Sequence, residues 1–411
     1  MDKPKSNTSF SLLNLIGKGK NKGIKENIDL HYVRDMIFGC FNNGKEKLII
    51  RSDKPLTTLI LTPKGTQKTA KFAIPNLLSL PQSCVVLDIE GELYAKTASR
   101  REEKLNNKIL LFSPLSDENT MFFNPFDNKV VKNMNLSQYT KLVTHIADAI
   151  FVDTDSTESS PEAEGIENKH WILSAKAMFK FFALYSLVKH HHTTLPDLAQ
   201  APTKDYYDEL KGEYLKMCQI KNEQTGELER NIREDALKVF FLQTANDKSL
   251  SDSLTHQARR YLTATESEFA QIKSTYESFM AVFNNPQIAE ALSSMSFYYE
   301  DLRKEYITMY ITLHNKDLDM LAPLVRILLE TLCENLMAEK IQNPDKFIYL
   351  ILDDFVRFGK MPFLLEMPAL CGDCGIAPVY IAQSYEQIKE CYGQNGLDII
   401  CAHWHIKLYL E

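Results

Sequence analysis

The sequence predicts an α/β fold: a doubly wound core with an all-α segment inserted into it. Three observations lead to this prediction. Apolar runs of strand length alternate with helical segments over residues 46–114. From about residue 169 to about residue 288, helical periodicity continues with almost no strand signal. After residue 307, the alternation of strand and helix resumes, as in a sheet that an insertion has divided.

The first part of the predicted core consists of short strands and the helices that join them. "AKFAIPNLLSL" (70–80) suits a helix that Pro75 would end or kink. "SCVVLDIEGE" (83–92) is an apolar run followed by acids, which is typical of a strand buried on both faces of a parallel sheet. The remaining elements expected here are strands at 46–52, 57–63 and 108–114 and a helix at 92–106.

The middle of the chain differs in composition from what precedes it. Residues 151–168 are acidic and rich in serine, which indicates a solvated loop. Helices are expected after it at 170–190, 233–246 and 267–283. The core then returns with a strand at 307–313, a long amphipathic helix at 322–341, and strands at 346–355, 375–384 and 403–411.

Length and charge limit the possible classes of protein. The 411 residues are enough for two domains, and we expect a flexible lead-in (1–37), a core in two parts (38–150 and 301–411) and an all-α domain (151–300). The net charge of -7 excludes a global attraction to nucleic acid. Scattered cysteines, no apolar run of roughly 20 residues and no export signal predict a cytoplasmic protein in this form.

Residues 62–69, "TPKGTQKT", end in Lys-Thr, as a phosphate-binding loop does. The usual pattern is G-x-x-x-x-G-K-[ST], and here Thr62 and Gln67 replace the two glycines. A lysine at the end of such a loop reaches the β- and γ-phosphates, and the hydroxyl after it ligates Mg²⁺. The residues expected to hold ATP are therefore Pro63, Lys64, Gly65, Thr66, Gln67, Lys68 and Thr69, with Thr69 also on the metal.

Two later strands end in polar side chains that complete such a site. Asp353 follows "IYLIL" and is placed to hold Mg²⁺ through water, as a Walker B aspartate does. Asp354 is placed to orient or activate the attacking water, and Gln383 to sense the γ-phosphate. Ligands of open α/β sheets bind at the carboxyl ends of the strands, where these side chains are expected.

The order of these motifs resembles the TraG-like coupling proteins of type IV secretion systems. "IPNLLSLPQSCVVLDIEGE" (74–92) is similar to the family's segment after the phosphate loop, I-P-N-L-L-x-x-P-x-S-x-V-V-x-D-x-K-G-E. "FFNPFD", His170-Trp171 and "NNPQIAEALSSMSFYYEDLRKEYITMYITL" resemble the entry into and the return from the helical insertion. "LILDDFVRFGKMP" and "GIAPVYIAQSYEQIKECYG" resemble the Walker B and sensor strands. The resemblance covers roughly residues 38–411.

The resemblance implies a RecA-like P-loop NTPase core and a function in passing DNA–protein or protein substrates to a secretion channel. It implies partners among the inner-membrane components of the secretion system, a location peripheral to the bacterial inner membrane, and a possible homo-hexamer. The membrane helices that often begin family members are missing, and the chain ends at Glu411 on a strand. A truncated form, monomeric or weakly associating when isolated, is the expectation.

Several departures from the family pattern predict ATP binding with weak hydrolysis. Gln67 would have to adopt positive φ, which costs on the order of 1 kcal/mol. Asp354 is one methylene shorter than the usual glutamate, and Glu90 replaces the usual lysine. The alternative is an inactive adaptor with the same fold that binds substrates or subunits. A DNA translocase of the FtsK and HerA type shares the core, but the long helical insertion argues against it.

Overall fold

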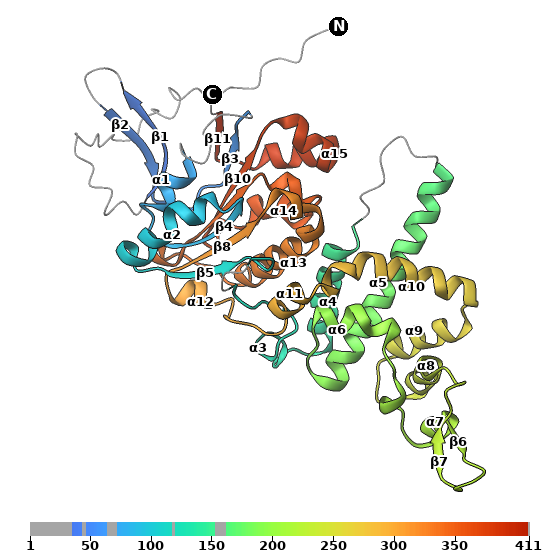
Figure 1. Cartoon of the computed structure of the whole chain (residues 1–411). Helices are drawn as coiled ribbons and strands as arrows, with labels where there is room; N and C mark the ends of the chain where they lie inside the picture. Colours follow the sequence, from blue (N-terminus) through green and yellow to red (C-terminus); the bar gives the residue numbers. More distant parts are fainter. Residues whose placement is uncertain (1–34, 43–46, 64–71, 117–119, 153–161, 410–411) are drawn as a thin grey trace. The chain divides into compact units, whose positions relative to one another are not determined.

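The computed structural model describes residues 35–42, 47–63, 72–116, 120–152 and 162–409, and they form two compact units (Figure 1). The sheet unit comprises the described residues up to Phe112, Tyr299–Leu318 and those from Glu334 onward. The helical unit comprises those from Ser113 to Tyr298 and Asp319–Cys333. The domain boundaries near residues 150 and 300 that the sequence indicates stay a prediction.

The sheet unit is built on seven parallel strands in the order β11-β3-β10-β9-β4-β8-β5. Helices flank this sheet, so the predicted α/β core is confirmed. The central strands read as continuous apolar runs because both of their faces are covered and buried. The strands are β3 (Thr58–Leu61), β4 (Ser83–Ile89), β5 (Lys108–Phe112), β8 (Ile307–Leu313), β9 (Ile348–Asp353), β10 (Ile376–Ala382) and β11 (Ile406–Tyr409).

Neighbouring residues of β10 show how the two faces of the sheet are covered. Val379 and Ile381 belong to an apolar cluster with side chains of α1 (Ile74–Leu77) and α2 (Glu92–Leu105). Tyr380, between them, faces the other way: its ring contacts Phe355, and its hydroxyl donates to the Leu364 carbonyl of α14 at 3.0 Å. Successive side chains of a strand point to opposite faces, so β10 bridges two separate cores. The other helices of this unit are α12 (Asp301–Lys304), α14 (Phe363–Leu370) and α15 (Tyr385–Ala402).

Helix α1 is short, and Pro75 does not end it. The proline lies in the first turn, where no backbone N–H is required, and the helix stops at Leu77. Asn76 explains part of the "IPNLL" sequence, because its amide pairs with the backbone of Ile37, at 2.7 and 2.8 Å. Ile37 lies in β1 (Met36–Asn42), which forms an antiparallel pair with β2 (Lys47–Ser52).

A buried arginine secures the segment that follows α1. Arg101 of α2 is fully buried, and its guanidinium donates to the carbonyls of Leu77 and Leu80 at 2.6 and 2.8 Å. It also donates to the Gln82 carbonyl at 2.8 Å and to Asn107 Oδ1 at 2.9 Å. The charge is thus solvated by dipoles that converge on it, which is how a buried cation is tolerated without a carboxylate.

The helical unit is organised around an aromatic core. Phe181 of α5 contacts Phe240 and Phe241 of α8 and Tyr261 of α9, with ring centroids 5.6 to 6.4 Å apart. The segment is not wholly helical, because β6 (Gln219–Lys221) and β7 (Leu228–Arg230) form a small hairpin. The helices are α3 (Asn128–Val131), α4 (Leu136–Ile150), α5 (Glu162–His190), α6 (Leu195–Gln200), α7 (Gly212–Met217), α8 (Ala236–Asn246), α9 (Asp252–Thr263), α10 (Glu266–Met280) and α11 (Pro286–Ala291), and α13 (Leu318–Leu336) has residues in both units.

Helix α5 corrects one expectation about apolar segments. Within the described residues, the stretch Asn168–His190 is long and apolar enough to cross a membrane by length and composition alone. More than half of that stretch is buried inside the protein, as in the core helix of a soluble protein.

Candidate functional site

Four strands bring the predicted site residues to one edge of the sheet. β3, β10, β9 and β4 are consecutive neighbours, and all of them run in the same direction. In register, Leu61 lies beside Ala382, Asp353 beside Ile381, and Leu87 beside Leu352. The carboxyl ends of all four strands therefore meet at a single edge, where ligands of open α/β sheets bind.

The predicted phosphate loop follows directly from β3. Thr62 is buried, and its N–H donates to the Ala382 carbonyl at 3.0 Å, so the sheet pairing continues one residue past the strand. Pro63 is exposed at the point where the loop begins. The rest of the predicted loop lies outside the described residues: Lys64, Gly65, Thr66, Gln67, Lys68 and Thr69.

The structure places Asp353 and Asp354 differently, although they are adjacent in the chain. Asp353 is the last residue of β9 and is 9% exposed. Asp354 leaves the strand with φ of 49°, in the left-handed region, and starts the 3-10 turn η9 (Phe355–Phe358). Aspartate is among the residues that tolerate this conformation, and such strained positions gather at functional sites.

Gln383 lies next to Asp354. Its Nε2 is 3.5 and 3.4 Å from the two carboxylate oxygens of Asp354, at the long end of hydrogen-bond distance. Its backbone N–H donates to Gln387 Oε1 at 3.0 Å, which fixes the first turn of α15 against the end of β10. The two residues predicted for water activation and phosphate sensing are therefore within contact of each other.

A second buried carboxylate lies at this edge beside Asp353, and the sequence reasoning did not assign it a function. Asp88 of β4 is 2% exposed and accepts hydrogen bonds from the N–H groups of Leu93 and Tyr94, at 3.1 and 2.7 Å. Burial raises the pKa of Asp88 to about 6, with a further contribution from the charge of Asp353, against these two hydrogen bonds. The sequence feature that could have identified Asp88 is an apolar strand that ends in an acidic residue, as β9 does.

Glu90 makes local contacts that explain how a carboxylate is accommodated here. Its backbone has φ of 71°, and its side chain accepts from the backbone N–H and the amide of Asn315, at 2.8 and 2.6 Å. These bonds, with His314 Nδ1 at 3.2 Å, lower the pKa of Glu90, the backbone bond contributing most. Arg357 donates to Asn315 Oδ1 at 3.0 Å, so Glu90, Asn315 and Arg357 link the ends of β4, β8 and β9.

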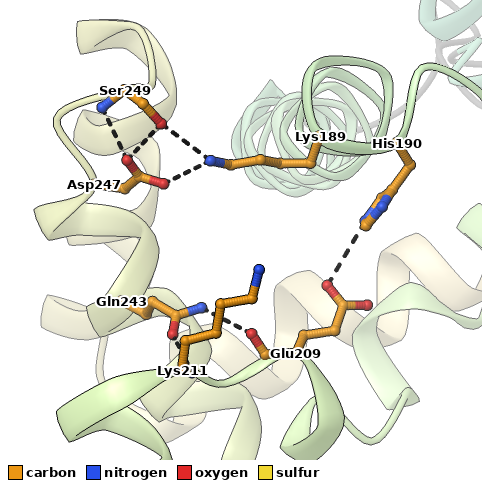
Figure 2. A network of polar contacts seen from close by, with 7 residues as sticks. All are labelled: Lys189, His190, Glu209, Lys211, Gln243, Asp247 and Ser249. Atoms are coloured by element: carbon orange, nitrogen blue, oxygen red, sulfur yellow. Dashed lines mark hydrogen bonds and ion pairs between the residues drawn. The ribbon is translucent and has the colours of Figure 1, made fainter.

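The helical unit has a cavity of its own, of about 540 Å³. Tyr185, Tyr206, His190 and Glu209 are among the residues that line it. Figure 2 shows the polar network beside it, in which His190 Nε2 lies 3.8 Å from Glu209 Oε2. In the same network Gln243 accepts from the Lys211 N–H and donates to the Glu209 carbonyl, while Lys189 Nζ pairs with Asp247 and contacts Ser249 (Figure 2).

The cavity belongs to a size class that accepts small molecules or side chains of a partner. Its aromatic lining residues are buried, whereas its polar ones include two side chains of opposite charge, Lys204 and Glu209, which form an ion pair. Lys204 Nζ also lies 5.4 Å from the centre of the Tyr206 ring. Asp197 is a second carboxylate in the lining, so the cavity is amphipathic and has no excess of positive charge.

Comparisons with known proteins agree with this architecture. The family described as "Type IV secretory system Conjugative DNA transfer" matches residues 21–410. "Conjugal transfer protein TraG" of Escherichia coli is 25% identical over 370 residues, which are 87% of this chain and 53% of TraG. "Protein VirD4" of Rhizobium radiobacter is 23% identical over 357 residues, 86% of this chain and 45% of VirD4. The chain thus spans about half the length of these relatives.

Solved structures of the coupling protein TrwB share the fold. The unbound form of TrwB has a TM-score of 0.56 at 13% identity, over 87% of this chain and 70% of TrwB. A TrwB complex with a non-hydrolysable ATP analogue gives a TM-score of 0.55 at 13% identity, over 86% and 70% of the two chains. The family match spans almost the entire sequence, and this chain therefore belongs to the type IV secretory system conjugative DNA transfer family.

Proposed function

We propose that the chain is a type IV secretion coupling protein that binds ATP with Mg²⁺ and recruits or passes DNA–protein or protein substrates to a secretion channel. The observation that carries the proposal is the meeting of Asp353, Asp354 and Gln383 at the strand edge where β3 leads into the predicted phosphate loop. Family membership adds independent support.

The residues present at this edge fit a hard divalent cation. Asp88 and Asp353 are both buried carboxylates at the ends of adjacent strands, and the charge of one raises the pKa of the other. Mg²⁺ prefers such oxygen ligands and keeps several of its waters. Bound with ATP, it would neutralise charge on the phosphates. Asp353 and Thr69 would hold the ion, and TrwB, a fold neighbour, has been solved with ADP and Mg²⁺.

The other residues would act on the phosphates and the attacking water. Lys68 would contact the β- and γ-phosphates, while Pro63 to Thr69 would supply the rest of the loop. Asp354 would orient the water and accept its proton, and Gln383, in contact with Asp354, would detect the γ-phosphate. The short reach of Asp354 is consistent with slow hydrolysis.

The family supplies the rest of the proposal. We assign residues 38–150 and 301–411 to the nucleotide-binding core and residues 151–300 to an all-α domain that contacts substrates. The proposed partners are inner-membrane components of the secretion system and other copies of this chain in a homo-hexamer. The proposed location is the cytoplasmic side of the bacterial inner membrane.

One observation favours a second candidate, an adaptor that does not turn over ATP. The helical unit carries an amphipathic cavity that does not depend on the nucleotide site. Together with the unusual residues at positions 62 and 67, this cavity would suit a chain that retains the fold only to bind substrates or subunits.

The test is whether nucleotide binding depends on Mg²⁺ through Asp353. Isothermal titration of the purified chain with ATP should show tighter binding with Mg²⁺ than with EDTA, and Asp353→Asn should remove most of that difference. Asp398→Asn, on the exposed surface of α15, makes the same chemical change and should leave it intact. Equal binding with and without Mg²⁺ in the wild type would contradict the proposed site and favour the adaptor.

A further inference from the structure

A second concave feature lies at the opposite edge of the sheet. It is a hollow of about 480 Å³ in the sheet unit, between the amino-terminal end of β5, the turn from α12 into β8, and the segment before β9. The nucleotide site described above uses the carboxyl ends of the strands. The hollow lies at the amino-terminal ends of the strands. A ligand in the hollow would therefore not compete with a nucleotide, and the hollow is a separate site.

Positive charge predominates in the lining of this hollow. Four cations line it (Lys108, Arg303, Lys304 and Lys346) against two carboxylates, Glu305 and Asp345. The chain as a whole carries a net charge of -7, so this concentration of cations is local. A concave surface with an excess of one sign of charge attracts ions of the opposite sign.

Most of this positive charge is not neutralised within the described part of the chain. The side-chain amines of Lys108 and Lys346 form no ion pair or hydrogen bond with any described residue, whereas Lys304 lies 3.4 Å from Glu300. Both free amines are on exposed residues, so they are available to an incoming anion.

Arg303 contributes positive charge to the hollow, but its guanidinium N–H groups are already used in hydrogen bonds to the protein. Its guanidinium donates to the carbonyls of Lys346 and Cys374, both at 2.6 Å, and of Leu336 at 3.2 Å. It forms no ion pair with a carboxylate among the described residues, and burial lowers its pKa to about 10, so it stays protonated at neutral pH. The positive charge of Arg303 is therefore fixed in place while the two lysines remain mobile.

We propose that this hollow binds the phosphodiester backbone of single-stranded nucleic acid, with Lys108 and Lys346 as the phosphate contacts. Tyr306 lines the same hollow. Sites that bind single-stranded nucleic acid usually combine cations with an aromatic side chain on which a base stacks. This site is distinct from the ATP site. Its charge supports a polyanionic ligand, and the choice of nucleic acid as that ligand rests on the proposed function in DNA transfer.

An anionic membrane surface fits the hollow less well. The feature is concave, whereas a bilayer is flat at this scale. Proteins that dock on membranes also insert apolar side chains, and none of the large hydrophobic residues exposed in the described chain lines this hollow.

The experiment measures the anisotropy of a fluorescein-labelled 20-nucleotide oligothymidylate titrated with the full chain at several salt concentrations. The site variant is Lys108→Glu with Lys346→Glu, and the matched control is Lys54→Glu with Lys389→Glu. The control lysines are also exposed in the sheet unit, lie outside the hollow, and give the same change in net charge.

We expect the wild type to bind and the site variant to bind at least tenfold more weakly, with the control within twofold of the wild type. Each phosphate contact contributes roughly 0.7 to the slope of log affinity against log salt, so losing two should reduce the slope by roughly 1.4. ATP binding should be unchanged in both variants, which separates this outcome from a failure of the nucleotide site.

Three results would overturn the proposal: no binding by the wild type, equal weakening in both variants, or an unchanged salt slope. A parallel titration with vesicles containing 30% phosphatidylserine distinguishes the membrane alternative. Binding to vesicles that the site variant loses, with no binding to the oligonucleotide, would assign the hollow to lipid. Circular dichroism melting curves of both variants must match the wild type, and Lys108→Ala with Lys346→Ala replaces the site variant if they do not.

Discussion

Replacing Arg101 by methionine should destabilise the sheet unit strongly, because the buried guanidinium serves several acceptors at once. The carbonyls of Leu77, Leu80 and Gln82 each lose a donor. The Gln82 carbonyl keeps the Cys84 thiol as a donor, at 3.5 Å. An unsatisfied buried acceptor costs about 1–3 kcal/mol, so the other two carbonyls would cost about 2–6 kcal/mol before relaxation. Removing a buried charge recovers part of its desolvation cost. We therefore expect a net loss of about 2–4 kcal/mol in the free energy of unfolding.

The neighbouring Arg100 provides a matched control for this change. Its side chain is half-buried and donates a hydrogen bond to the Leu78 carbonyl at 3.1 Å, so Arg100→Met should cost about 1 kcal/mol or less. The chain has two tryptophans, and Trp404 packs on Tyr380 in the sheet unit. In a Trp171→Phe background, urea unfolding followed by fluorescence would report on that unit alone. Equal costs for the two arginine substitutions would refute this account of the buried network.

Two further predictions concern the candidate site. The pKa of Asp88 is raised from near 3.8 to about 6, so the folded state binds the extra proton, and this group's contribution to stability falls as pH rises from about 4 to 6. Stability of the wild type relative to Asp88→Asn should therefore fall by about 2 kcal/mol between pH 4 and pH 7, measured by urea unfolding, and a flat difference would contradict the raised pKa. Gln67→Gly combined with Asp354→Glu should raise the rate of ATP hydrolysis, by up to about a hundredfold if misplacement of the carboxylate limits the rate. A phosphate-release assay would measure it, and an unchanged rate would locate the defect elsewhere.

The sequence was sufficient to predict the core strands because they are buried on both faces. The apolar runs "SCVVLDI" and "IYLILD" fit few structures other than a central parallel strand, and in the structure they form β4 and β9. The meeting of Asp354 with Gln383 was also predictable, since strand ends of a parallel sheet share an edge. The strand order was not predicted, because pairing depends on contacts between segments hundreds of residues apart, such as β3 with β10 and β11.

Other features depend on tertiary contacts that no local pattern indicates. The hairpin of β6 and β7 is exposed and polar, so it lacks the apolar alternation that marks a strand. Pro75 was expected to end a helix, but its position in the first turn depends on where α1 begins. The pKa of Asp88 follows from burial beside Asp353, and the hollow around Lys108 and Lys346 joins residues far apart in the chain.

Nucleotide binding by the purified chain tests the central claim most directly. Titration with ATP and Mg²⁺ should show saturable binding, and Lys68→Ala should weaken it at least tenfold, a loss of about 1.4 kcal/mol. Lys54→Ala, a lysine exposed before β3, is the control and should bind as the wild type does. The absence of saturable binding by the wild type at millimolar ATP would contradict the nucleotide site and leave the adaptor as the better account.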